Sequence, residues 1–133
     1  MTKKQLQRYR GLVSEREDIK ALISELETEY ASLRPSKLDG LPKGTNTSSD
    51  RMADILIRRD ELLSMYRGKI ESIAAELRAI ENAIDGLEPT ERRLMRYRYI
   101  DGLSWEEVAT RMAYSTQRTY QLHGRTLKKI RVY

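Results

Sequence analysis

The spacing of the apolar residues most limits what this chain of 133 residues can fold into. In alternating steps of three and four, apolar residues recur from residue 9 to 33 and again from residue 52 to 87. The first series is Tyr9, Leu12, Arg16, Ile19, Ile23, Leu26, Tyr30 and Leu33, and the second is Met52, Leu56, Arg59, Leu63, Tyr66, Ile70, Ile73, Leu77, Ile80, Ile84 and Leu87. Apolar residues at this spacing form one stripe along a helix, as in a coiled coil. The sequence therefore predicts two long helices, each with a narrow apolar seam.

The segment between the two series favours a turn. Pro35 ends the first helix, and residues 39–50 are rich in turn-forming residues and almost without apolar ones. We expect a linker over residues 35–49 and an antiparallel hairpin domain over residues 1–86. Each seam is interrupted by one arginine, Arg16 or Arg59, and these two lie far apart in such a hairpin. Each arginine is expected to extend its charged head past the seam edge.

The second series is crowded between residues 55 and 66, where apolar side chains exceed what one seam covers. An exposed apolar stripe often marks a contact with another protein. The candidates for self-association are Ile55, Ile57, Leu62 and Met65. A wider seam within one chain explains them equally well, so a homodimer or higher oligomer is a hypothesis.

After residue 86 the pattern changes to short helices with capping signals. Pro89 suits the first position of a helix that runs to about Ile100. The sequence Ser104-Trp105-Glu106-Glu107 has the form of a capping box and starts a second helix. A third helix is expected over residues 115–130. Two short helices joined by a tight turn predict a helix-turn-helix. The expected fold is all-α, with a long helical hairpin followed by a three-helix domain over residues 87–133.

Charge is divided unevenly along the chain. Residues 1–86 hold 15 basic and 15 acidic side chains, whereas residues 87–133 hold 10 and 5, so the net charge of +5 lies in the last third. Residues 113–133 contain no acidic side chain. A basic segment of this kind is typical of proteins that bind polyanions. The sequence therefore favours double-stranded DNA as a partner.

The third helix holds the side chains that could read DNA. In a helix-turn-helix, the start of the second motif helix points at base edges in the major groove. The expected base contacts are Thr116, Gln117, Tyr120 and Gln121. Glutamine suits the hydrogen-bonding edge of adenine. The expected phosphate contacts, which position a helix without reading sequence, are Ser104, Trp105, Ser115, Arg118, Arg125, Lys128 and Lys129.

Composition argues against catalysis. The chain has no cysteine and one histidine, which excludes thiolate chemistry and a multi-histidine metal site. His123 alone is expected to pack or to contact phosphate. We expect no catalytic residue, metal, cofactor or small-molecule substrate, and therefore no enzyme. The start of the chain is charged, and no run approaches the ~20 apolar residues of a membrane span. We expect no membrane association and a place in the cytoplasm.

The segment from Leu87 to Ile130 resembles region four of sigma factors, the domain that binds the −35 promoter element. The residues Arg98-Tyr99 and Gly102-Leu103-Ser104-Trp105-Glu106-Glu107-Val108-Ala109 fit its "RY…GLSxxEIA" run, and residues 115–130 fit its recognition helix without a gap. One departure is Ala113, because many members place glycine in this turn. The resemblance implies a DNA-binding helix-turn-helix.

The hairpin, the connector LPKGTNTS and the ending RTYQLHGRTL together resemble small phage or prophage transcriptional regulators of the RinA and ArpU kind. That resemblance implies control of late phage genes by a DNA-binding regulator. Two alternatives stay open. A small terminase-like packaging subunit also joins a helix-turn-helix to an oligomerising helical part, and a helix-turn-helix can bind RNA polymerase in place of DNA.

Overall fold

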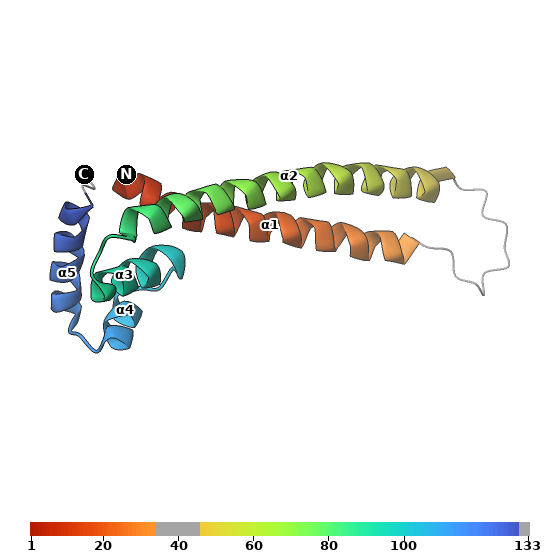
Figure 1. Ribbon diagram of the computed structural model, residues 1–133. Coiled ribbons are helices and arrows are strands. Elements are labelled where there is room, and N and C mark those ends of the chain that lie inside the picture. Colours follow the sequence, from red (N-terminus) through yellow and green to blue (C-terminus); the bar gives the residue numbers. More distant parts are fainter. Residues whose placement is uncertain (34–45, 131–133) are drawn as a thin grey trace. The chain divides into compact units, whose positions relative to one another are not determined.

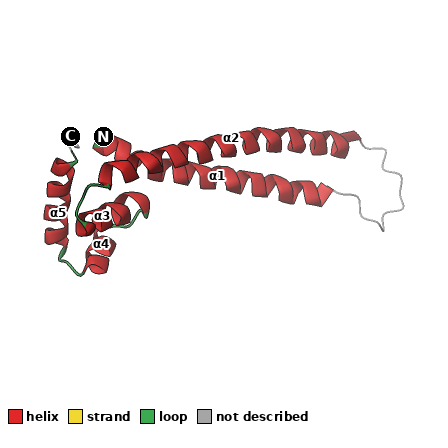
Figure 2. Cartoon of the chain, viewed as in Figure 1, coloured by secondary structure: helices red, strands yellow, loops and turns green. Residues whose placement is uncertain are grey.

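The computed structural model describes residues 1–33 and 46–130, and every regular element in these ranges is a helix (Figure 2). This confirms the all-α prediction. The elements, labelled in Figure 1, are α1 (Lys3–Leu33), α2 (Asn46–Ile84), α3 (Pro89–Met95), the π-helix η1 (Arg96–Ile100), α4 (Trp105–Met112) and α5 (Thr116–Lys129). Because α2 begins at Asn46, the last residues of the expected linker 35–49 are helical. The connector's earlier residues lie outside the described ranges.

The chain divides into two compact units, and the division differs from the expected boundary at residue 86. One unit spans residues 15–70, and the other joins residues 1–14 to the chain from residue 71 onward. The start of α1 and the end of α2 therefore belong with the C-terminal helices.

Ion pairs between α1 and α2 link the two helices within the unit of residues 15–70. Glu15 pairs with Lys69, Glu27 lies 3.6 Å from the Nε of Arg59, and Glu29 lies 2.7 Å from the Nε of Arg51. Positions rise along α1 as they fall along α2, so the two segments run antiparallel, as Figure 1 shows.

The apolar seam of this unit follows the prediction on α1 and, except at Leu56 and Ile70, on α2 as well. On α1, Ile19 is buried and the later seam positions are half-buried. On α2, Ile55 and Leu62 are buried, whereas the expected Leu56 and Ile70 are 40% and 43% exposed. The sequence places apolar residues side by side at 55–56 and 62–63, and periodicity does not choose between two adjacent stripes.

This pattern of burial corrects two of the residues expected to mediate self-association. Ile55 and Leu62 are each 1% exposed within the chain, so they are not available to a second copy. Ile57 and Met65 are 60% and 48% exposed.

The two seam arginines combine a buried and an exposed part. The Nε of Arg16 and the Nε of Arg59 are buried without a hydrogen-bond partner. The outer Nη2 of Arg16 lies 3.0 Å from Glu17, and both arginine side chains stay partly exposed. The outer part of each arginine side chain thus reaches past the seam edge as expected, and its buried Nε makes no hydrogen bond.

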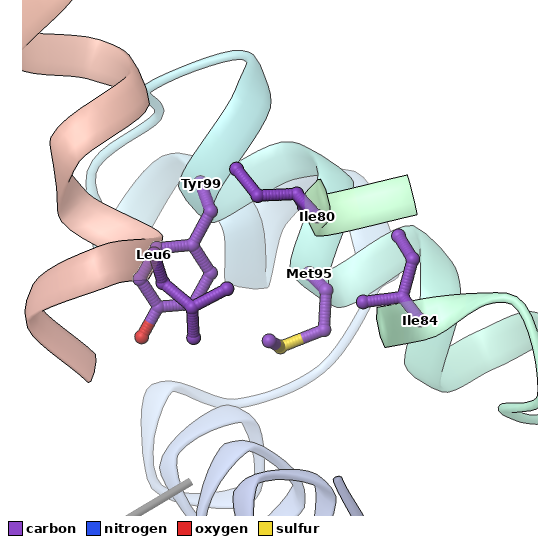
Figure 3. Close-up of a cluster of buried hydrophobic side chains, with 5 residues drawn as sticks. All are labelled: Leu6, Ile80, Ile84, Met95 and Tyr99. Carbon is purple, nitrogen blue, oxygen red and sulfur yellow. The ribbon is translucent and has the colours of Figure 1, made fainter. Parts of the chain in front are cut away.

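The second unit has its main apolar cluster where four elements meet. Leu6 of α1, Ile80 and Ile84 of α2, Met95 of α3 and Tyr99 of η1 point toward one another (Figure 3). The three expected C-terminal helices therefore do not form this core alone. Residues of α1 and α2 supply part of it.

The start of α1 also contacts the loop after η1. Arg10 donates a hydrogen bond from Nη1 to the carbonyl oxygen of Ile100 at 3.3 Å. Its guanidinium fills the space beside Gly102, where an added Cβ would lie 2.5 Å from the Arg10 Nε. Gly102 has a φ of +72°, so the backbone conformation favours glycine here, whereas the flexible Arg10 side chain could move aside for a Cβ.

Candidate nucleic-acid interface

Two serine caps and a tight turn build the helix-turn-helix. The Ser104 hydroxyl accepts the backbone N–H of Glu107 at 3.2 Å, and the Ser115 hydroxyl accepts that of Arg118 at 3.1 Å. These contacts start α4 and α5 where the sequence predicts. Between them, Ala113 has φ 58° and ψ 39°. Alanine therefore adopts the left-handed conformation that glycine takes at much lower cost.

The helix from Pro89 reaches Ile100 as expected, but its last turn is a π-helix. The backbone N–H of Asp101 donates to the carbonyl oxygen of Arg96 at 2.9 Å. Arg98 donates from Nη1 to the carbonyl oxygen of Leu103 at 2.9 Å, and its guanidinium lies 4.5 Å from the Trp105 ring centroid. Arg98 thereby holds the loop that leads into α4.

One face of α5 is buried and polar. Its members are Thr119, His123 and Thr126, each at most 7% exposed. His123 Nε2 lies 2.6 Å from the hydroxyl of Tyr99, and the Trp105 ring meets the His123 ring edge-on at 4.6 Å between centroids. These contacts fix the rotation of α5 on the other helices, so His123 packs and does not face a phosphate.

Burial sets the protonation of this pair. Burial, together with the nearby charges of Lys3 and Arg98, lowers the pKa of His123 to about 4. Burial also raises the pKa of Tyr99, partly offset by Arg98. Both side chains are therefore neutral near pH 7.

The four expected base-contacting residues lie outside the buried face of α5. Thr116, Gln117 and Gln121 are exposed, and Tyr120 is 48% exposed. The Tyr120 ring also lies 5.2 Å from the Trp105 ring, which limits its movement. The first two turns of α5 thus present the predicted set together to the surroundings.

The residues expected to contact phosphate separate into groups. Arg118, Arg125 and Lys128 are exposed as predicted. Ser104 and Ser115 already use their hydroxyls as helix caps. Trp105 packs among Arg98, Tyr120 and His123, so its ring has a structural role.

Lys129 departs from the prediction. Its ammonium lies 2.9 Å and 3.0 Å from the two carboxylate oxygens of Glu91, so it is committed to an internal ion pair. Glu91 is 4% exposed and also accepts hydrogen bonds from Thr126 and from the backbone N–H of Glu88. Burial alone raises the pKa of Glu91, but Lys129 and these donors outweigh it and lower that pKa overall. The cluster joins the start of α3 to the end of α5.

Sequence reasoning missed a group of arginines that stack on tyrosines. Arg93 and Arg111 lie over the ring of Tyr97, and Arg118 lies over the ring of Tyr114. The spacing of Arg93 and Tyr97, four residues apart on one helix, was a visible signal. Arg111 approaches Tyr97 from a different helix, and no local pattern in the sequence indicates this contact.

The described part of the chain holds no cluster of three or more metal-ligating side chains. None of its helices is long and apolar enough to cross a membrane.

Residues 83–132 match the family model of sigma-70, region 4. The C-terminal helices therefore form a sigma-70 region 4-like helix-turn-helix domain. No curated protein and no solved structure gives a significant match to the chain.

Proposed function

We propose that the chain is a sequence-specific regulator of transcription that reads the major groove of double-stranded DNA with α5. The observation that carries this proposal is the exposure of Thr116, Gln117 and Gln121 on the first two turns of α5. The opposite face of the helix is held by buried polar contacts, so these side chains have a defined direction. The match to sigma-70 region 4 supports the same assignment.

The side chains define how DNA would be read. A glutamine can make two hydrogen bonds to the adenine edge, and each such pair discriminates by about 1–3 kcal/mol. Arg118, Arg125 and Lys128 are free to contact phosphates beside the reading segment. Three phosphate contacts give a slope of about −3 when log affinity is plotted against log salt concentration.

The test begins with selection of bound fragments from a pool of duplexes by the intact protein. On the best fragment, Gln117→Ala and Gln121→Ala should each weaken binding about tenfold to a hundredfold. Affinity for an unrelated duplex should stay the same, since phosphate contacts remain. Gln7→Ala, which changes an exposed glutamine of α1, is the matched control. The proposal is wrong if the intact protein binds no duplex even at low salt.

We further propose that two copies act together, because a single small reader binds specific sites weakly. The exposed Ile57 and Met65 of α2 supply apolar side chains for contact with the second copy. Two readers would then occupy half-sites separated by whole helical turns, about 34–36 Å each. Light scattering should return two chains for the protein and one for the double variant Ile57→Glu, Met65→Glu. A molar mass of one chain at micromolar concentration would show that this part of the proposal is wrong.

The setting we propose is control of phage or prophage genes in the bacterial cytoplasm, on the resemblance to regulators of the RinA and ArpU kind. A packaging subunit would instead form ring-sized assemblies in solution. A polymerase-binding module would keep its activity when Gln117 and Gln121 become alanine. The mass measurement and the glutamine variants therefore separate the three interpretations.

A further inference from the structure

Three arginines and two tyrosines form two neighbouring groups that the base-reading role of α5 does not use. Together we call them the Arg–Tyr surface, and its members are Arg93, Tyr97, Arg111, Tyr114 and Arg118. The Cζ atoms of Arg93 and Arg111 lie 5.9 Å and 5.7 Å from the Tyr97 ring centroid, and that of Arg118 lies 4.2 Å from the Tyr114 ring centroid. The residues come from α3, η1, α4, the turn and α5.

Arg93 is held at Tyr97 by a hydrogen bond as well. Its Nη2 donates to the Tyr97 hydroxyl at 3.3 Å. The two groups are three residues apart along the chain, from Arg111 at the end of α4 to Tyr114 in the turn, and together they extend from α3 to the first turn of α5. All three arginines are exposed.

The charge of these arginines is not neutralised within the described ranges, where none of the three forms an ion pair with a carboxylate. Arg96, one turn from Arg93, does lie 3.8 Å from Glu81. Stacking on a ring uses the face of a guanidinium and leaves its in-plane N–H groups available. It also orders a long side chain in advance, which reduces the entropy lost on binding. Such donors suit the oxygens of phosphate groups.

We propose that the Arg–Tyr surface binds DNA backbone phosphates flanking the segment that α5 reads. This inference rests on the proposed function and extends it from α5 to α3 and α4. The position of Arg118 favours DNA over an acidic protein as the occupant, because Arg118 lies in the first turn of the reading helix. The surface adds affinity and fixes orientation without adding base preference.

The experiment measures binding of the full chain by fluorescence anisotropy over a series of salt concentrations. The probes are the best selected duplex and a scrambled duplex of equal length. The double variant Arg93→Gln, Arg111→Gln should weaken binding of both duplexes by the same factor. Its log–log salt slope should be smaller by about 2, because two phosphate contacts are lost. The ratio of the two affinities should not change.

A matched control removes the same charge elsewhere. Arg58→Gln with Arg67→Gln changes two exposed arginines of the unit 15–70 and should leave the salt slope unchanged. Far-ultraviolet circular dichroism and thermal melting establish that each variant is folded.

The tyrosine provides a second, finer measurement. Tyr97→Phe keeps the ring beside Arg93 and Arg111 but removes the hydroxyl that accepts from Arg93, so it should weaken binding less than Tyr97→Leu does. Tyr97→Leu removes the ring and should weaken both duplexes severalfold.

The proposal is overturned if the arginine double variant binds with the parent's slope and affinity, or if only its base preference changes. If the intact protein binds no duplex, the proposed function is wrong, and this inference is wrong as well. The two failures are distinct because the parent binds in one and not in the other.

Discussion

Arginine is used differently in the hairpin unit and in the C-terminal helices. Within residues 15–70, Arg16, Arg51, Arg58 and Arg59 each lie beside a carboxylate. In the C-terminal helices, Arg93, Arg111 and Arg118 lie over tyrosine rings. A carboxylate neutralises a guanidinium, whereas a ring supports it and leaves the charge in place. The same residue type is thus neutralised in one region and presented in the other.

The buried groups of the two regions differ as well. The unit of residues 15–70 buries aliphatic side chains such as Ile19, Ile55 and Leu62, while α3 and α5 bury Glu91, Thr119, His123 and Thr126. Buried polar groups are costly when one partner is lost, and exposed ion pairs contribute little. Changes in the C-terminal helices should therefore cost more, and should depend more on pH, than changes in the hairpin unit.

The largest expected effect is at Glu91. Glu91→Ala leaves the Lys129 ammonium and the backbone N–H of Glu88 without this acceptor, which should lower the free energy of unfolding by about 3 kcal/mol. Urea denaturation measures it. Glu81→Ala removes a longer, exposed pair with Arg96 and should cost less than about 1 kcal/mol. Equal losses in the two variants would contradict the contrast between buried and exposed carboxylates.

The second effect concerns pH. The pKa of His123 is about 4 in the folded state, against an ordinary value of 6.5, so the unfolded chain binds the proton first as the pH falls. The contribution of the neutral, buried ring is complete above pH 6.5 and is lost as pH falls toward 4. Between pH 7 and pH 5 the free energy of unfolding should drop by about 2 kcal/mol.

His123 is the single histidine of the chain, so this pH range isolates it from the carboxylates. His123→Gln should abolish most of the drop between pH 7 and pH 5. A drop of the same size in that variant would show that another group causes it.

The smallest expected effect lies in the hairpin seam, where a substitution should raise the free energy of unfolding. Arg59→Leu removes an Nε that is buried without a hydrogen bond, and its 3.6 Å ion pair with the exposed Glu27 contributes little. We expect a gain of about 1 kcal/mol, seen as a higher melting temperature. Arg58→Leu, at the neighbouring exposed position, is the control and should change stability by less than about 0.5 kcal/mol. A lower melting temperature for Arg59→Leu would mean that the ion pair with Glu27 contributes more stability than burial of the Nε costs.

Much of the architecture was predictable because it depends on local signals. The seam of α1, the proline at the start of α3 and the two serine caps each act within a few residues, and the structure has all of them. The exposure of Gln117 and Gln121 also follows from the position of the Ser115 cap, which sets where α5 begins.

What could not be predicted depends on contacts between distant residues. The choice of Ile55 over Leu56 for the seam requires knowledge of the facing helix. Glu91 and Lys129 are separated by 38 residues, so nothing near Lys129 indicates that its charge is already paired. Likewise, Tyr97 meets Arg111 only because η1 and α4 fold against each other.

The sequence by itself determined that this chain is helical, where its helices begin, and which helix carries unpaired basic charge. Propensity, capping and charge are properties of short segments, and they persist in any arrangement of those segments. The tertiary structure decided which apolar stripe is buried, which lysine is neutralised and which arginines stay available. Those outcomes depend on the neighbours that each side chain meets after folding, and burial changes the energy of a charge far more than its position in the chain does.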